Sequence, residues 1–282
     1  MDDLRDAWDL PDTFMWRDRA VRWRRLSDEG PPLVFCHGTP WSSWLWAPFA
    51  NALAGYWSVH VWDMPGYGQS GMADGDVSLG AQGEVFSALL SHWALERPHV
   101  VAHDIGGTVA LRAHLLHGME YGSLALVDVV ALAPWGSPFY RLVRDHADAF
   151  MALPAPMHAA LVRAYIAGAS ATQLPADALD ALVAPWLGRV GQAAFYRQIA
   201  QSTQLHTDQI EPRYGDVSAP TLVVWGSEDT WIPVDRASRL ADAIPHAQLE
   251  IIGGAGHLVQ LDQPARLAMT LQRWLDGQRR VL

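Results

Sequence analysis

The chain has 282 residues, and half of them are hydrophobic, which is enough to bury a large core and more than one simple domain needs. Its formal net charge is −10. Six arginines lie between Arg5 and Arg25, but acidic and aromatic residues are interleaved with them, so they form no basic face. We therefore expect one α/β domain with an insertion, and nucleic acid is excluded as a partner.

Cysteine content and hydropathy restrict the remaining classes of protein. Cys36 is the only cysteine, so an intramolecular disulfide and a cysteine-rich metal site are both excluded. The segment Met1–Leu10 carries four aspartates and no apolar core of a signal peptide. No stretch of the chain reaches the roughly 18 apolar residues that span a membrane. These features predict a cytoplasmic protein, monomeric or homodimeric, without a membrane partner.

The first third of the chain predicts strands that end in turn-rich loops. Alternating residues from 13 to 26 indicate a β-hairpin. The apolar run Leu33–Cys36 is typical of a central strand, and it ends at His37-Gly38-Thr39-Pro40. Residues 41–53 are rich in aromatic side chains and show a helical pattern in their second half. Val59–Asp63 then predicts a further strand.

Helices and strands alternate in the next part of the chain. Ser78 can cap a helix that runs to about Leu95, and a strand follows from Pro98 to His103. A second helical pattern comes after this strand, and Leu124–Asp128 predicts another strand. Such alternation is typical of a mostly parallel sheet with helices on both faces.

The alternation stops at residue 134. Residues 134–214 have a helical pattern without a convincing strand, and prolines interrupt it at five points, namely Pro138, Pro154, Pro156, Pro175 and Pro185. Strands return at Pro220–Gly226 and Leu249–Ile252, and helices are expected from Val234 to Ile244 and from Pro264 to about Asp276. We therefore predict a helical cap over 134–214, inserted into an α/β core that comprises 1–133 and 215–282.

The stretch from Pro98 to Leu111 has the pattern of a nucleophile elbow, a sharp turn between a strand and a helix. The backbone at the apex of such a turn is strained, and small residues two positions before and after the apex let strand and helix approach. Ala102 and Gly106 meet this need around Asp104. Esterases and lipases carry serine at this apex. The alternative is that Asp104 only caps the following helix.

Two further residues follow strands and can reach Asp104, because ligands of open α/β sheets bind outside the carboxyl ends of the strands. His257 ends the glycine-rich loop after the last predicted strand, and Asp229 follows the strand before it. The order nucleophile, acid and histidine is the one expected of this architecture. Asp229 would accept a hydrogen bond from His257 Nδ1. Glu228 and Asp128 are the alternatives for this acid.

Backbone N–H groups can complete the site. Gly38 keeps its loop tight, so the Thr39 N–H can point toward Asp104. Together with the Ile105 N–H it would form an oxyanion hole.

With these motifs, nearly the whole chain resembles an α/β-hydrolase of the branch with an aspartate nucleophile, which includes epoxide hydrolases and haloalkane dehalogenases. The similarity is weakest in the cap. An aspartate carboxylate can attack an sp³ carbon and form an alkyl ester. His257 would then activate the water that hydrolyses the ester at Asp104. No metal and no organic cofactor is implied by this chemistry.

The resemblance to epoxide hydrolases extends to the segment Phe195-Tyr196-Arg197. It implies that Tyr196 donates a hydrogen bond to the epoxide oxygen. Family members usually have a second cap tyrosine, for which Tyr165 is the candidate and Tyr140 the reserve. Alternatively, Phe195 and Tyr196 only pack a cap helix.

The resemblance to haloalkane dehalogenases lies in the loop from Thr39 to Trp46. Those enzymes usually have a halide-binding tryptophan directly after the nucleophile and often an asparagine or glutamate before the proline, where this chain has Ile105 and Thr39. Dehalogenation would need another indole donor, for which the candidates are Trp41, Trp135 and Trp186.

We therefore predict a hydrolase that acts through an alkyl ester on Asp104, with an epoxide as the first choice of substrate and an alkyl halide as the alternative. Tryptophans near the loop and the cap favour a bulky apolar or aromatic substrate, with water as the second reactant. His37 is expected to lie with the substrate-binding residues. A non-catalytic binding protein of the same fold is the alternative from another class, and the intact set of nucleophile, acid and histidine argues against it.

Overall fold

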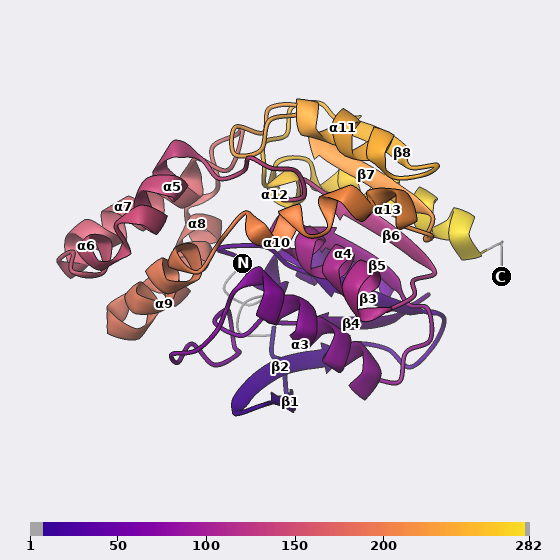
Figure 1. Ribbon diagram of the computed structural model, residues 1–282, viewed down its shortest axis with the longest axis horizontal. Coiled ribbons are helices and arrows are strands. Elements are labelled where there is room, and N and C mark those ends of the chain that lie inside the picture. Colours follow the sequence, from indigo (N-terminus) through magenta and orange to yellow (C-terminus); the bar gives the residue numbers. More distant parts are fainter. Residues whose placement is uncertain (1–7, 280–282) are drawn as a thin grey trace.

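The computed structural model describes residues 8–279, and an eight-stranded sheet forms its centre (Figure 1). Spatial order across the sheet is β1-β2-β4-β3-β5-β6-β7-β8. Strands β3 to β8 run parallel, whereas β2 is antiparallel to both β1 and β4. The strands are β1 (Asp12–Trp16), β2 (Arg19–Arg25), β3 (Pro32–Cys36), β4 (Ser58–Trp62), β5 (His99–His103), β6 (Ser123–Val127), β7 (Thr221–Gly226) and β8 (Gln248–Ile252).

Helices cover both faces of this sheet. Helices α3, α4 and α11 contribute to the apolar cluster on one face, and α2 and α13 contribute to the cluster on the other. The helices of the core are η1 (Ser43–Trp46), α2 (Ala47–Leu53), α3 (Leu79–His92), α4 (Ile105–His117), α11 (Asp235–Ala243), α12 (Val259–Asp262) and α13 (Pro264–Arg279). The predicted α/β fold with its mostly parallel sheet is confirmed.

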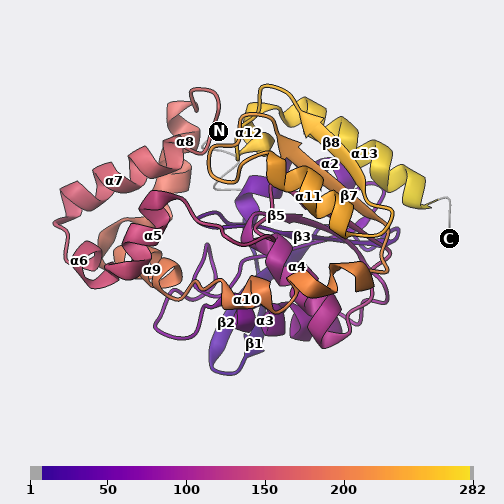
Figure 2. The same ribbon diagram turned by 45° about the horizontal axis from the view of Figure 1, so that its top comes forward.

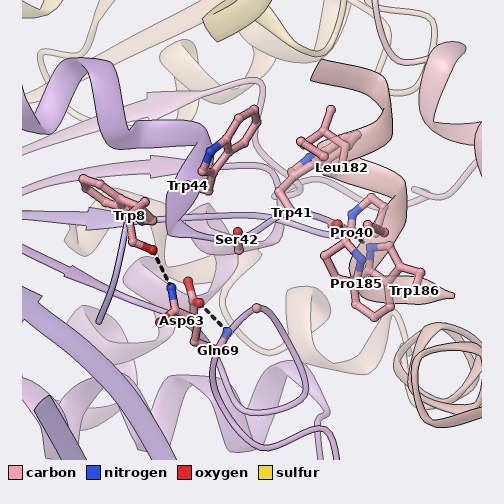
Figure 3. A pocket seen from close by; sticks show the side chains of 13 residues that line it. Trp8, Pro40, Trp41, Ser42, Trp44, Asp63, Gln69, Leu182, Pro185 and Trp186 are labelled. Carbon is pink, nitrogen blue, oxygen red and sulfur yellow. Dashed lines mark hydrogen bonds between the residues drawn. The ribbon is translucent and has the colours of Figure 1, made fainter. Parts of the chain in front are cut away.

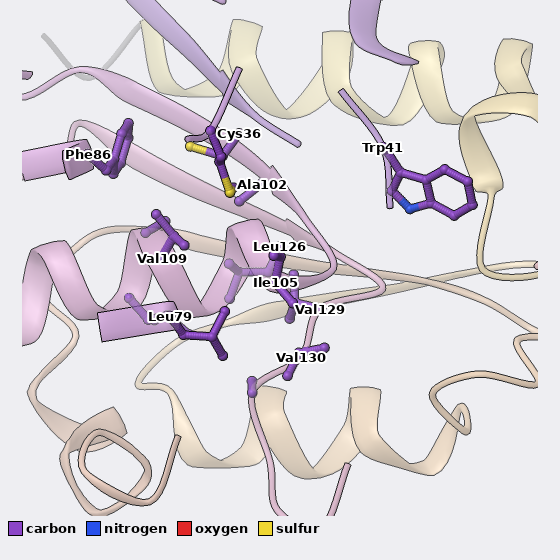
Figure 4. Packing of buried hydrophobic residues seen from close by; sticks show 14 of the residues in the cluster. Cys36, Trp41, Leu79, Phe86, Ala102, Ile105, Val109, Leu126, Val129 and Val130 are labelled. Atoms are coloured by element: carbon purple, nitrogen blue, oxygen red, sulfur yellow. The ribbon is translucent and has the colours of Figure 1, made fainter. Parts of the chain in front are cut away.

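Strands β4 to β7 are buried along their whole length, as expected of parallel strands that helices cover on both faces. Edge strands β1 and β8 remain largely exposed. Ala102 of β5, Leu126 of β6 and Val109 of α4 belong to the same apolar cluster (Figure 4). Cys36 lies in the same cluster, and burial raises the pKa of its thiol. This cysteine is therefore a core residue rather than a nucleophile.

The segment between β6 and β7 is helical, as predicted, and contains no strand. Its first five α-helices form a layer beyond one end of the sheet (Figures 1 and 2), whereas α10 lies close to α4. Arg112 of α4 donates a hydrogen bond of 2.7 Å to the carbonyl of His206 in α10. The elements of the segment are α5 (Pro138–Asp145), α6 (Ala147–Met151), α7 (Ala155–Ala167), α8 (Ala176–Val183), η2 (Ala184–Trp186), α9 (Gly188–Ala200), α10 (Leu205–Asp208) and η3 (Glu211–Asp216).

One carboxylate joins the cap to the loop that precedes His257. Asp262 accepts hydrogen bonds from the Ala171 N–H at 2.9 Å and from the Gly256 N–H at 2.7 Å. It also accepts one from the Thr172 hydroxyl at 2.8 Å. The loop after α7 and the histidine loop are thus fixed to the same side chain. Among residues 8–279, no helix is long and apolar enough to cross a bilayer.

Candidate active site

Asp104 occupies a sharp turn between β5 and α4, as the elbow pattern predicts. Its φ of 52° and ψ of −125° lie in a region that non-glycine residues rarely adopt. Neighbouring glycines make the turn possible. A Cβ on Gly106 would lie 2.5 Å from the His37 carbonyl oxygen, and one on Gly38 would lie 2.3 Å from the Asp104 Cβ. The strained backbone therefore positions a buried carboxyl group at the carboxyl end of the sheet.

His257 lies between two carboxyl groups. Its Nδ1 is 2.9 Å from Asp229 Oδ2, and its Nε2 is 3.3 Å from Asp104 Oδ2. Asp229 is held in turn by the N–H groups of Trp231 and Ile232, which donate to its Oδ1 at 2.7 and 2.9 Å. The structure thus brings together the three predicted catalytic residues. Glu228 is exposed and makes no such contact.

His103 supports the loop that carries His257, a role that was not predicted from the sequence. Its Nε2 is 2.9 Å from the carbonyl oxygen of His257, so the ring donates a hydrogen bond there. Burial lowers the pKa of His103 to about 3, so the ring is neutral. The only sequence signal was its position directly before the apex of the elbow.

The charges around His257 favour its protonated form. Burial opposes protonation, but the carboxylates of Asp229 and Asp104 outweigh burial and raise the pKa of His257 well above its usual range. Conversion of Asp104 into a neutral ester would remove one of these charges. The pKa of His257 would then fall, and the neutral imidazole could accept a proton.

Replacing Asp104 by asparagine mimics this loss of charge. We expect the pKa of His257 to be lower in Asp104→Asn than in the wild type, because only Asp229 then stabilises the imidazolium. Proton titration of the His257 ring followed by NMR measures the difference. An unchanged pKa would show that the Asp104 charge does not act on His257.

The two predicted oxyanion donors lie beside Asp104. The Thr39 N–H donates a hydrogen bond of 2.7 Å to Asp104 Oδ1. Ile105 is the first residue of α4, where N–H groups have no acceptor within the helix. Both N–H groups are therefore placed to stabilise negative charge on an oxygen at Asp104.

A small cavity opens onto Asp104. Most of its lining is apolar or aromatic, and Asp104 contributes the one carboxyl group. Trp231, two residues after Asp229, was not predicted from the sequence to lie here. Its ring stacks on His257 with 5.1 Å between centroids. The lining residues are Thr39, Asp104, Ile105, Val130, Trp135, Gly136, Ser137, Tyr140, Tyr165, Trp231 and Ile232.

The tyrosines of the cap are arranged differently from the expectation. Tyr165 and the reserve candidate Tyr140 line the cavity, but Tyr196 does not. The Tyr196 hydroxyl is instead 2.9 Å from Nδ1 of His158, whose Nε2 is 2.8 Å from the Trp186 carbonyl. Tyr196 is fully buried among cap side chains. Its expected contact with a leaving group is therefore wrong, because the side chain packs inside the cap.

Only one of the three candidate indole donors lines the cavity at Asp104. Trp41 and Trp186 line another cavity, between the cap and the core (Figure 3), whereas Trp135 does line the cavity at Asp104. The Trp186 N–H donates to the Pro40 carbonyl at 2.9 Å. The Trp135 N–H donates to the Thr207 hydroxyl at 2.9 Å. Neither of these two N–H groups is free to bind a halide.

His37 has a structural role rather than the expected role in substrate binding. Its Nε2 accepts a hydrogen bond from the Met64 N–H at 2.9 Å, which leaves Nδ1 to donate to the Gly38 carbonyl at 2.8 Å. The side chain is fully buried. His37 thus connects the loops after β3 and β4 and holds Gly38 against Asp104.

The described residues contain one group of side chains close enough to share a metal ion. One ligand atom each of Asp128, Asp229 and His257 lies within 4.8 Å of the others. However, Asp229 and His257 are already hydrogen-bonded to each other. This group therefore does not offer a set of free metal ligands.

Comparison with known proteins identifies the family. Residues 33–270 match the alpha/beta hydrolase family. A solved alpha/beta hydrolase fold protein from Burkholderia ambifaria is 48% identical, with a TM-score of 0.91 over 94% of this chain and 97% of that one. A 2-hydroxy-6-oxononadienedioate/2-hydroxy-6-oxononatrienedioate hydrolase from Cupriavidus pinatubonensis is 29% identical over 81% of both chains.

Other similar proteins include a solved structure with the same fold and a relative without an assigned activity. A haloalkane dehalogenase from Bradyrhizobium elkani is 20% identical, with a TM-score of 0.83 over 96% of this chain and 99% of that one. An uncharacterized protein from Mycobacterium tuberculosis is 28% identical over 89% of this chain and 77% of its own length. The sequence match, the fold and the arrangement of Asp104, His257 and Asp229 agree, and the chain belongs to the alpha/beta hydrolase family.

Proposed function

We propose that this hydrolase opens small, uncharged epoxides through a covalent ester on Asp104. The Asp104 carboxylate would attack an epoxide carbon, and the carbon–oxygen bond would break with transfer of a proton to the leaving oxygen. Water activated by His257 would then attack the ester carbonyl, and the N–H groups of Thr39 and Ile105 would stabilise the oxyanion. The product would be a diol, and Asp104 would be regenerated.

The observation that carries this proposal is the presence of two tyrosines in the cavity at Asp104. Burial raises the pKa of both Tyr140 and Tyr165 above the usual value, so both hydroxyls keep their protons at neutral pH. Tyr165 is fixed by stacking on Trp231, with 4.4 Å between centroids. Two neutral O–H donors suit an epoxide oxygen, which needs a proton when the ring opens.

The cavity also limits the substrate. The space in this cavity is small, which favours a compact substrate over the bulky one that the tryptophan content suggested. No arginine lines the cavity. A substrate with two carboxylates, such as the one named for the relative from Cupriavidus pinatubonensis, would find no positive partner there.

A haloalkane is the second candidate, and Trp231 is the observation in its favour. Trp231 lines the cavity at Asp104 and its ring stacks on His257. A halide needs N–H donors, whereas an epoxide needs a proton donor. The two candidates therefore differ in which cavity residue they require.

Phenylalanine variants separate these requirements. We expect Tyr140→Phe and Tyr165→Phe each to lower kcat for styrene oxide by about 10²-fold, the usual contribution of a general acid, while the rings keep their packing. Tyr196→Phe is the matched control, because its hydroxyl contacts His158 outside the cavity. Steady-state rates with styrene oxide and with 1-bromobutane measure the effects. Unchanged epoxide rates in both cavity variants, or a loss only in Tyr196→Phe, would contradict the proposal.

A further inference from the structure

Asp128 is a buried carboxyl group beside the catalytic residues that the proposed chemistry does not use. It follows β6 directly, its φ is 46°, and its side chain has no exposure to solvent. Its Oδ1 accepts one hydrogen bond of 2.8 Å from the Gly226 N–H. Its Oδ2 is also buried and has no donor among the described residues. An ionised oxygen in this position would lack compensation for its lost hydration.

The nearest titratable groups are the acid and the histidine of the triad. One ligand atom each of Asp128, Asp229 and His257 lies within 4.8 Å of the others. Two buried carboxylates at such a separation repel each other strongly, and one of them keeps a proton. Asp229 accepts two backbone N–H groups on Oδ1 and faces His257 Nδ1 with Oδ2. Asp128 accepts one N–H, so its anion is less well stabilised.

From this contrast we infer that Asp128 and Asp229 share one proton, that Asp128 holds it on Oδ2, and that Asp128 donates a hydrogen bond to the catalytic acid. Asp128 is then a positioning residue, because it acts through Asp229 and does not contact the reacting atoms. The shared proton satisfies the orphan oxygen and keeps the Asp229 carboxylate oriented toward His257. The direction of the pKa of Asp128, raised by burial and by the charge of Asp229, agrees with this arrangement.

The shared proton can be detected without a substrate. It rests on the proposed function only in that Asp229 is called the catalytic acid. A negative result at Asp128 is therefore distinct from a failure of the proposed function. Infrared spectroscopy detects the carbonyl stretch of a neutral carboxyl group, which shifts in heavy water. Aspartate labelled with heavy carbon in its side-chain carboxyl identifies the band as aspartate. We expect the wild type to show this band at neutral pH and Asp128→Asn to lack it.

Asp229→Asn distinguishes proton sharing from burial alone. With Asp229 neutral, Asp128 no longer faces a carboxylate and is next to the imidazolium of His257, so we expect it to ionise and the band to disappear. A band that persists in Asp229→Asn would overturn the inference, because burial alone would then keep Asp128 neutral. A band that persists in Asp128→Asn would overturn it as well. Should Asp128→Asn not fold, the Asp229→Asn spectrum decides alone.

Asparagine and valine at this position test the positioning role. Asparagine keeps an N–H donor for Asp229, whereas valine leaves Asp229 without it. We expect Asp128→Asn to unfold at nearly the wild-type urea concentration and to keep the wild-type pKa of His257 in an NMR titration. We expect Asp128→Val to raise that pKa, because the unshared Asp229 charge acts fully on His257. Equal pKa values in the two variants would overturn the role of Asp128 as a donor.

Discussion

Asp104→Ala is expected to lower kcat for an accepted epoxide by about 10⁴-fold or more, the size of loss that follows removal of a nucleophile acting as part of a triad. No ester can form on residue 104 without the carboxylate. The variant should still fold, since alanine removes only side-chain atoms from the elbow. Initial rates and circular dichroism measure the two effects.

The result that would contradict this account is a folded Asp104→Ala protein with a kcat near that of the wild type. Water attack on the epoxide, directed by His257 alone, would then be the mechanism. Asp104 would in that case be only the residue that precedes helix α4, which is the alternative that its sequence position left open.

The second large effect concerns Gly38, which has no catalytic atoms. A Cβ at this position would lie 2.3 Å from Asp104 Cβ and 2.6 Å from Asp104 Oδ1, so Gly38→Ala must displace the Asp104 side chain. Misplacement of a reacting group by about 1 Å costs about 10²-fold in rate, and we expect at least this loss in kcat. The rate of ester formation in a single turnover measures it directly.

Gly55→Ala is the matched control, because a Cβ there meets no atom within 4 Å. It should retain the wild-type kcat. Equal activity of Gly38→Ala and Gly55→Ala would mean that the elbow can move away from the loop after β3. The close contact between that loop and Asp104 would then not control the position of the carboxylate.

The core of the fold and the triad were accessible from the sequence because each depends on local patterns. Apolar runs mark β3, β5, β6 and β7, and parallel strands bring their carboxyl ends to one edge. Asp104, Asp229 and His257 each follow such a strand. The choice of Asp229 over Asp128 was also made on position in the chain, and the 2.9 Å contact with His257 supports it.

The cap was less predictable, because its side chains are partnered by residues far away in the sequence. Tyr196 resembles a family tyrosine in its immediate neighbours, yet His158, 38 residues earlier, takes its hydroxyl. The N–H of Trp186 is likewise occupied by Pro40, 146 residues earlier. The periodicity of a sequence predicts where a helix lies, but not which residues its side chains contact. Tyr140 and Trp231 could therefore be placed in the cavity only by the structure.

Intact-mass analysis of His257→Gln incubated with aryl epoxides tests the central claim most directly. Without the base, attack by Asp104 can proceed but hydrolysis of the ester stalls. The account predicts an increase in mass by one epoxide molecule, located on the peptide that contains Asp104 and absent from the Asp104→Ala/His257→Gln double variant. Absence of any adduct with an epoxide that the wild type converts to a diol would contradict the proposed ester on Asp104. An adduct formed with alkyl bromides alone would make the protein a dehalogenase.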